Sequence, residues 1–419
     1  MPICPRETSV KDTAHDILHH NSLIHTAVKD VKDKIQKLRQ LRYFSFLSLS
    51  LQASYIYTYS MANKNLNRAK EAKKDEFYTQ LEDINNEMKH YREHFRGKTV
   101  LCNCDDPRVS NFFTYFAYNF EFLGLKKLIT TCYKNQDIDL FSQNKSEEAV
   151  YLVYEGDKNG DHIPNAEEIG VKPLKGNGDF RSKECIELLK EADIVVTNPP
   201  FSLFREYVAQ LMEYDKKFLI IGNQNNVTYK EIFPLLMQNK VWLGYKTGDM
   251  AFKVPSDSEP RETRYWEDES GQKWRSLGNI CWFTNLDHRK RHEDLILYKN
   301  YSPEEYPHYD NFDAIEVSKT DTIPLDYEGI MGVPLTFLDK YSPDQFEILG
   351  ITKTWFGMAN KTYPEQIQVD KNGKEKRVRK LNDGAVLEVQ HPPIGKTYYK
   401  VNGKFYIQTY PRILIRRKK

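Results

Sequence analysis

Short apolar runs alternate with amphipathic segments between residues 70 and 285, and this alternation constrains the fold more than any other feature of the sequence. The apolar runs are typical of buried strands, and the amphipathic segments repeat their apolar residues at helical spacing. The pattern predicts an α/β protein with a largely parallel, doubly wound sheet, in which ligands bind beyond the carboxyl ends of the strands. The predicted strands are 99–103, 127–132, 150–154, 193–197, 218–221 and 241–244, and the predicted helices are 75–95, 111–123, 181–191, 203–214 and 229–239.

The charges of the chain are almost balanced. Its 419 residues include 61 Lys and Arg against 59 Asp and Glu, which gives a net charge of +2. This balance excludes a basic nucleic-acid coat protein, so any binding to a polyanion must come from local patches. A mean hydropathy of −0.68 argues against a protein with many membrane spans. The length is sufficient for two or three domains.

The cysteines do not have the spacing of a metal site. Cys102 and Cys104 form the only close pair, whereas structural zinc sites use two pairs with longer internal spacing. Residues 157–168 match the ligand positions of a calcium loop, but His162 stands where that loop needs glycine, so we interpret the segment as a polar turn. The sequence therefore predicts no metal site, and it predicts reduced thiols in a cytoplasmic protein.

Residues 43–59 carry no charge and follow a basic run at 29–42. Their length approaches the roughly 20 residues of a membrane span, but their Ser, Thr, Gln and Tyr side chains are too polar for hydrocarbon. No short apolar core with a small-residue cleavage site is present, so we predict no signal peptide. Two interpretations stay open: residues 1–60 belong to the working protein, or Met61 is the true start.

The sequence Asn198-Pro199-Pro200-Phe201 follows one predicted strand and precedes a predicted helix, so it should lie at the carboxyl edge of the sheet. Two consecutive prolines hold the backbone extended and remove two amide donors. The Asn198 side-chain oxygen and the Pro199 carbonyl could each accept one hydrogen bond from a planar group that carries an NH2, and Phe201 could stack on that group. Asn-Pro-Pro is also common in simple turns, but the strand and helix around it favour a functional loop.

Residues 193–201 (DIVVTNPPF) and 73–80 (KKDEFYTQ) together resemble the EcoRI-type family of adenine-specific DNA methyltransferases. CNCDDP at 102–107 and GDFRS at 178–182 support the resemblance, which covers about residue 70 to the C-terminus. It implies a Rossmann-like sheet that binds S-adenosylmethionine and methylates the amino group of an adenine flipped out of duplex DNA. Asn198 and Pro199 would stabilise the positive charge that grows on the amino nitrogen.

The same resemblance implies cofactor contacts at four places. A segment before the first helix would contact the methionine end, and the loop after the first strand would offer an acid to the ammonium group. An acid after strand 150–154 would bind the ribose, and an Asp-Phe pair would bind the adenine. The residues for the methionine end are Phe77, Tyr78 and Thr79, and those in the loop after the first strand are Cys104, Asp105 and Asp106. The acid for the ribose is Glu155, and the pair for the adenine is Asp179 and Phe180.

After about residue 285 the strand–helix alternation fades, and basic clusters appear at 288–292, 374–380 and 416–419. Such runs are usually solvated surface, but an enzyme that acts on DNA needs positive faces for the phosphates. We therefore expect an N-terminal extension at 1–69, a catalytic domain at 70–285 and a target-recognition region at 286–419.

The expected partner is double-stranded DNA, with a cognate restriction endonuclease acting on the same site and a monomer favoured. Two alternatives stay open. An RNA or protein-amide methyltransferase could use the same loop, and an inactive protein with the methyltransferase fold could still bind nucleic acid. The intact Asn-Pro-Pro-Phe sequence favours an active enzyme.

Overall fold

The computed structural model describes residues 79–103, 110–132, 149–158, 164, 170–254, 260 and 262–418. Some predictions concern residues outside this described part, namely the extension at 1–69 and most of the calcium-like segment. Five of the expected cofactor contacts also lie outside it: Phe77, Tyr78, Cys104, Asp105 and Asp106.

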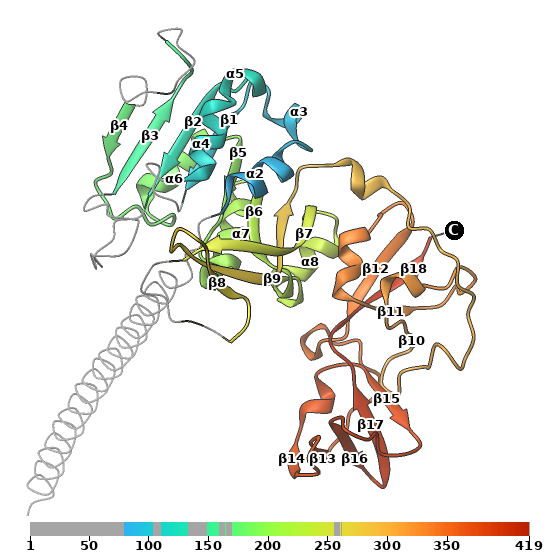
Figure 1. Ribbon diagram of the computed structural model, residues 1–419. Helices are drawn as coiled ribbons and strands as arrows, with labels where there is room; N and C mark the ends of the chain where they lie inside the picture. The colour runs from blue at the N-terminus through green and yellow to red at the C-terminus, as the bar shows by residue number, and fades with distance from the viewer. Residues whose placement is uncertain are drawn as a thin grey trace, which may run out of the picture. The chain divides into compact units, whose positions relative to one another are not determined.

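Four parallel strands form the centre of a sheet that has nine strands within the described residues (Figure 1). Every residue of the two innermost strands is buried. Strands covered on both faces read as continuous apolar runs, which is why the sequence located these strands well. In spatial order they are β2 (Lys127–Thr131), β1 (Thr99–Asn103), β5 (Ile194–Thr197) and β6 (Lys217–Asn223).

The outer strands run antiparallel, so the sheet is mixed, and the prediction of a largely parallel sheet was wrong outside its centre. Hydrophobic periodicity reports burial but carries no direction, and antiparallel neighbours need no crossover helix. On one side the order continues from β2 to β3 (Val150–Tyr154) and β4 (Gly170–Pro173). On the other side it continues from β6 to β9 (Lys273–Thr284) and β7 (Trp242–Lys253), with β8 (Tyr265–Glu267) also paired to β9.

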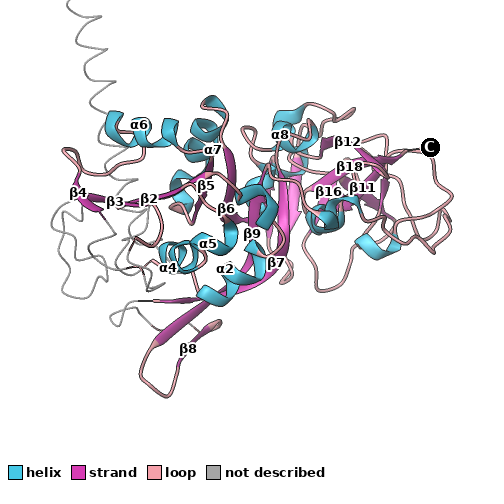
Figure 2. Cartoon of the chain, turned by 90° about the horizontal axis from the view of Figure 1, so that it is seen from above, coloured by secondary structure: helices cyan, strands magenta, loops and turns pink. Residues whose placement is uncertain are grey.

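Helices cover both faces of the sheet, as a doubly wound arrangement requires (Figure 2). Side chains alternate along each strand, so Leu101 packs in one core, whereas Val100 and Cys102 pack in the other. The face of Leu101 carries α6 (Lys183–Glu191), α7 (Phe204–Glu213) and α8 (Phe233–Met237). The opposite face carries α2 (Leu81–Met88), α3 (Arg92–Phe95), α4 (Asn111–Tyr118) and α5 (Phe120–Leu123).

Several helices are shorter than their patterns predict. The helix predicted over 75–95 is interrupted between α2 and α3, where Tyr91 leaves the helical region with φ of −124°. The helix predicted over 229–239 shrinks to α8, which has Pro234 in its first turn. The helix predicted over 111–123 ends as expected at Gly124, whose φ of 62° is left-handed and suits a residue without Cβ.

The C-terminal region forms two small sheets that are mostly antiparallel (Figure 1). The four-stranded sheet has the order β10 (Ile315–Glu316), β11 (Met331–Pro334), β18 (Arg412–Arg417) and β12 (Phe346–Ile351). The five-stranded sheet has the order β14 (Glu375–Val378), β13 (Gln366–Val369), β16 (Tyr398–Val401), β17 (Lys404–Gln408) and β15 (Val386–Val389). The 3-10 helices are η1 (Phe201–Leu203), η2 (Gln224–Thr228), η3 (Arg289–His292), η4 (Thr320–Thr322), η5 (Leu335–Lys340), η6 (Thr354–Phe356) and η7 (Lys380–Asn382).

The central sheet and the four-stranded sheet share one apolar core. Phe233 of α8 lies in the same cluster of buried side chains as Phe337 of η5 and Phe346 of β12. Asp339 adds polar contacts across the junction, because its Oδ1 accepts hydrogen bonds from Thr247 Oγ1 at 2.6 Å and from Lys290 Nζ at 2.5 Å. Residues before and after position 285 therefore contribute to one core.

Four cysteines fall within the described residues, and Cys102, Cys132, Cys185 and Cys281 are all buried with free thiols. In this part of the chain, no cluster of three or more His, Cys, Asp or Glu side chains is arranged to hold a metal ion. No helix of the described residues combines the length and the apolar character needed to cross a bilayer.

Candidate active site

Asn198 directly follows the carboxyl end of β5, between the parallel neighbours β1 and β6. It is only 8% exposed, and Pro199 beside it is also buried. Pro200 is extended, with φ of −54° and ψ of 125°, and its carbonyl accepts a hydrogen bond from the Leu203 N–H at 2.9 Å. The two prolines thus carry the chain stiffly from the strand into η1, as the sequence predicted.

Phe201 is half-buried and packs against the apolar core on the α2–α5 side of the sheet. The next residue, Ser202, has a buried Oγ with no hydrogen-bond partner among the described residues. A buried hydroxyl normally has a partner, so this atom is available to a polar group of a ligand. Sequence reasoning did not single out Ser202.

Asn103 ends β1 and is held by groups on both sides of the Asn-Pro-Pro-Phe loop. Its backbone carbonyl accepts a hydrogen bond from the Thr197 hydroxyl, one residue before Asn198. Its side-chain oxygen accepts a hydrogen bond from the hydroxyl of Tyr207, which lies in α7 directly after the loop. Sequence reasoning missed Asn103 and Tyr207. Two features of the sequence could have indicated them. Asn103 is a polar residue at the end of an apolar strand, and Tyr207 lies on the apolar face of an amphipathic helix.

Thr79 lies beside the amino end of α4. Its backbone carbonyl accepts a hydrogen bond from Asn111 Nδ2 at 2.8 Å, and Asn111 is the first residue of α4. Ser110 caps this helix, since its hydroxyl accepts hydrogen bonds from two backbone N–H groups. Thr79 is 2% exposed, and its Oγ1 has no hydrogen-bond partner among the described residues. The hydroxyl therefore fits a polar ligand at this edge.

Asp179 forms a close ion pair with Arg181. Its Oδ1 accepts hydrogen bonds from the backbone N–H and the Nε of Arg181, both at 2.9 Å, and its Oδ2 accepts from Nη2 at 2.7 Å. Burial raises the pKa of Asp179, but the hydrogen bonds and charge of Arg181 outweigh it and hold that pKa below its ordinary value. Asp179 is therefore an ionised acceptor at neutral pH.

Phe180 is mostly covered by the protein itself. Its ring packs edge to face against Tyr207, with centroids 5.0 Å apart, and the Arg181 guanidinium carbon lies 5.3 Å from its centroid. With 7% of its surface exposed, Phe180 offers little area to a cofactor. The structure gives this ring a packing role within the core beneath α7.

Glu155 lies at the opposite edge of the sheet from Asn198. The sequence predicts a ribose contact for Glu155 because it follows a strand of a largely parallel sheet. However, β3 runs antiparallel to β2, and Tyr154 pairs with Leu128 near the start of β2. The Glu155 side chain is exposed, and its Oε1 lies 3.4 Å from Nζ of Lys127, the first residue of β2. The geometry thus does not bring Glu155 to the site.

The carboxyl edge of the sheet therefore brings together the Asn-Pro-Pro-Phe loop, the end of β1 and, through Tyr207, the loop at 179–181. The Asn-Pro-Pro-Phe loop carries a buried side-chain oxygen and a carbonyl, and neighbouring segments carry an ionised acid and a buried hydroxyl. This set can hold an amino group and a polar ligand side by side.

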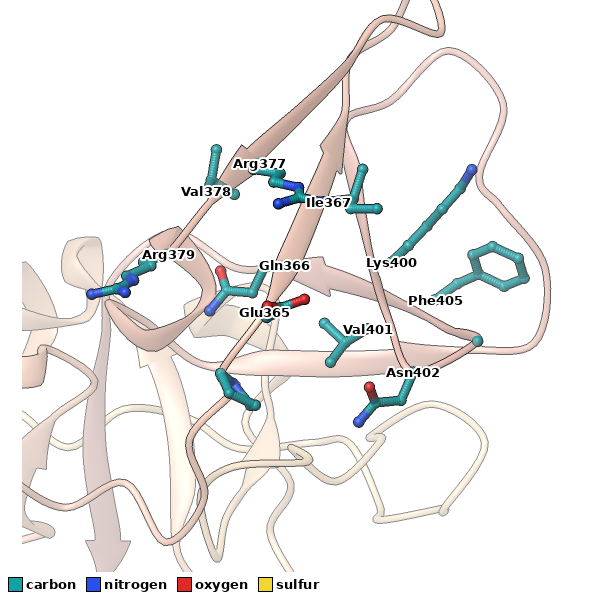
Figure 3. Close-up of a pocket in the computed structure, with 12 residues that line it drawn as sticks. Glu365, Gln366, Ile367, Arg377, Val378, Arg379, Lys400, Val401, Asn402 and Phe405 are labelled. Atoms are coloured by element: carbon teal, nitrogen blue, oxygen red, sulfur yellow. The ribbon is translucent and has the colours of Figure 1, made fainter.

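A concave surface lies on the five-stranded sheet and encloses about 720 Å³. Arg377, Ile367, Lys400 and Phe405 are register partners across four strands, so their side chains project from one face (Figure 3). Lys400 pairs with Glu375 at 2.6 Å. Within the described part of the chain, Arg377 forms no ion pair, and the same holds for Arg379, which also lines this surface.

Comparison with known proteins identifies the family. The family model described as "Adenine-specific methyltransferase EcoRI" matches residues 65–418. The type II methyltransferase M.EcoRI of Escherichia coli is 53% identical over 295 residues, which is 70% of this chain and 90% of the relative.

Two further relatives come from mycoplasmas. The type II methyltransferase M.MgeORF184P of Mycoplasma genitalium is 42% identical over 68% of this chain and 85% of its own length. M.MpnI of Mycoplasma pneumoniae is 42% identical over 68% of this chain and 84% of its own length. No solved structure matches the chain. The match to the family model and these identities show that this chain is an enzyme of the EcoRI family of adenine-specific methyltransferases.

Proposed function

We propose that this enzyme transfers a methyl group from S-adenosylmethionine to N6 of one adenine in a specific duplex DNA sequence. The observation that carries this proposal is the Asn198-Pro199-Pro200-Phe201 loop at the carboxyl end of β5, in a chain of an adenine-specific methyltransferase family. The relatives are type II methyltransferases by name, which supports a partner restriction endonuclease that cuts the same sequence. The proposal also takes the enzyme to be a cytoplasmic monomer.

The chemistry follows from the hydrogen-bond acceptors of the loop. The lone pair of the adenine amino group is delocalised into the ring, so the nitrogen is a poor nucleophile. We propose that the Asn198 side-chain oxygen and the Pro199 carbonyl each accept one hydrogen bond from the NH2 and so stabilise the positive charge that develops on it. Phe201 would stack on the base, which is worth on the order of 1–3 kcal/mol and helps to offset the cost of flipping it from the duplex.

S-adenosylmethionine, when bound, supplies an electrophilic methyl group on its sulfonium. Two residues of the described part fit its polar ends. The Thr79 hydroxyl is buried and has no partner among the described residues, so it suits the methionine end. The ionised Asp179 suits the adenine amino group as an acceptor. The proposed contacts also include Phe77, Tyr78, Cys104, Asp105 and Asp106, and they leave out Glu155.

Residues 286–419 are proposed to recognise the DNA. The support comes from the open face of the five-stranded sheet, where Arg377 and Arg379 have no acidic partner among the described residues. Cations without an acidic partner are suited to phosphates, whose contacts fix the position of a protein on the duplex. Phe405 and Ile367 on the same face provide apolar contact area.

A labelled-methyl assay tests the proposed function. The full chain is incubated with radiolabelled S-adenosylmethionine and, in parallel, with unmethylated duplex DNA, RNA and protein. We expect the label in DNA alone, recovered as N6-methyladenine at one recurring sequence. Label in RNA or protein alone would overturn the proposal in favour of another amino-group acceptor, and DNA binding without any label would indicate an inactive nucleic-acid-binding protein.

A further inference from the structure

Helix α7 begins almost directly after the Asn-Pro-Pro-Phe loop. Three of its residues contact segments at the carboxyl edge of the sheet, where the cofactor is proposed to bind. Tyr207 is fully buried in the core between α7 and the sheet. Glu206 and Gln210, one residue before and three residues after it, both contact the loop that carries Asp179. The first turns of α7 therefore touch every described segment of the proposed site except Thr79.

The first contact joins α7 to β1. The Tyr207 hydroxyl donates a hydrogen bond to Oδ1 of Asn103, the last residue of β1. The backbone carbonyl of Asn103 accepts from Thr197, which directly precedes Asn198. Asn103 is thus held by Thr197, which precedes the Asn-Pro-Pro-Phe loop, and by Tyr207 of α7, which follows that loop.

The second contact joins α7 to the loop at 179–181. The Phe180 ring meets the Tyr207 ring at 5.0 Å and 70°. Gln210 Nε2 donates to the Phe180 carbonyl at 3.1 Å, and Arg181 Nη1 donates to Glu206 Oε2 at 3.0 Å. The Arg181 that is held in this way also forms the ion pair with Asp179.

We propose that Tyr207 is a positioning residue that sets the Asn-Pro-Pro-Phe loop in register with the carboxyl end of β1 at Asn103 and with residues 179–181. This inference rests on the proposed function, because it takes the carboxyl end of β1 and residues 179–181 to lie against S-adenosylmethionine. Methyl transfer requires the amino nitrogen and the methyl carbon to be aligned at close range, and a misplacement of about 1 Å can lower a rate on the order of a hundredfold. A buried tyrosine that bonds to Asn103, packs on Phe180 and lies on the helix after the Asn-Pro-Pro-Phe loop controls this alignment without contacting either reactant.

The substitution Tyr207→Phe tests the proposal, since it removes one hydroxyl and keeps the ring that packs on Phe180. It leaves the buried Oδ1 of Asn103 without this donor, which frees the end of β1 to shift. We expect the Kd for S-adenosylmethionine, titrated calorimetrically on the full chain, to rise about tenfold, equivalent to about 1.4 kcal/mol. We further expect kcat to fall at least tenfold while the KM for DNA stays within twofold.

Tyr309→Phe is the matched control. Tyr309 is also buried and also loses a hydroxyl that donates to a buried acceptor, the carboxylate of Glu316, but it lies in the C-terminal region. We expect both variants to lose melting temperature, and only Tyr207→Phe to weaken cofactor binding. Equal cofactor Kd values for the two variants and the wild type, or an equal rise in both variants, would overturn the proposal. The titration needs no turnover, so its outcome is separate from the identity of the methyl acceptor.

Discussion

The Glu87 carboxylate of α2 accepts a hydrogen bond from the backbone N–H of Tyr245 in β7 at 2.6 Å. The same carboxylate also accepts from the backbone N–H of Lys246 at 2.8 Å and from the hydroxyl of Tyr91 at 2.9 Å. Burial raises the pKa of Glu87 to about 7, although these hydrogen bonds and the charge of Lys290 act to lower it. Glu87 therefore links helix α2 to the outer strand β7 through a carboxyl group that ionises near neutral pH.

This contact predicts a pH-dependent stability. The Glu87 pKa is 4.5 in the unfolded chain and about 7 in the folded protein, so folding takes up a proton between these values. The contribution of the protonated group is complete below pH 4.5 and is lost as the pH rises through about 7, amounting to about 3 kcal/mol. Urea unfolding of the wild type and Glu87→Gln, at about pH 5 and about pH 8, measures it. The wild type should lose more stability than the variant, and parallel pH profiles would contradict the prediction.

Asn198→Ala should abolish most of the methyl transfer. The substitution removes one of the two proposed acceptors for the adenine NH2, so we expect kcat to fall on the order of 10²–10³-fold. The DNA Kd should stay within a few-fold, because phosphate contacts elsewhere supply most of the affinity. Single-turnover rates and DNA titrations separate the two effects. Asn198→Asp keeps an acceptor oxygen and should retain more activity than Asn198→Ala, whereas near-full activity of the alanine variant would remove Asn198 from the mechanism.

Arg377 and Arg379 should contribute to DNA affinity through phosphates. In the double variant Arg377→Ala/Arg379→Ala we expect a higher KM for DNA. We also expect the slope of log Kd for DNA against log salt concentration to decrease by up to about 2. The cofactor Kd should not change. Lys126→Ala/Lys217→Ala is the matched control, because these two exposed cations form no ion pair with a described residue and lie at the amino end of β2 and β6, away from Asn198. A salt dependence that falls equally in both variants would mean that Arg377 and Arg379 have no special role.

Gly222→Ala should destabilise the protein. A Cβ at this position of β6 would lie 2.5 Å from Cε2 of Phe204 and 3.0 Å from Cε2 of Phe283, and both rings are fully buried. Overpacking of this kind costs about 1–3 kcal/mol. At Gly176 the nearest atom would be 3.9 Å away, so Gly176→Ala should stay within about 0.5 kcal/mol of the wild type. Chemical unfolding of both variants checks the prediction, which fails if Gly222→Ala is as stable as Gly176→Ala.

The strand, loop and helix around the Asn-Pro-Pro-Phe sequence could be predicted because their determinants are local. An apolar run, two prolines and an amphipathic helix follow one another between Ile194 and Glu213, and β5, the extended Pro200 and α7 form where this order requires. The alternation of buried residues likewise located β1 and β2 to within one residue.

The rest depends on pairing between distant segments, which local patterns do not encode. The direction of β3 relative to β2 decides which edge of the sheet Glu155 occupies, and periodicity is the same in either direction. The hydrogen bond from Tyr207 to Asn103 joins residues that are about one hundred positions apart. The sequence also contains no sign that Arg377, Ile367 and Lys400 would lie in one row.

The position of β9 has a consequence for how the protein acquires its structure. β9 inserts between β6 and β7, and Leu219 of β6 pairs with Thr284. During synthesis the edge of β6 therefore stays unpaired until β9 emerges from the ribosome, roughly 60 residues later. Pairing between strands so far apart in the sequence slows folding. During that interval the edge exposes unpaired backbone groups to other chains. Newly made protein should therefore be most prone to aggregate at this stage, and β9 closes the edge once it has left the ribosome.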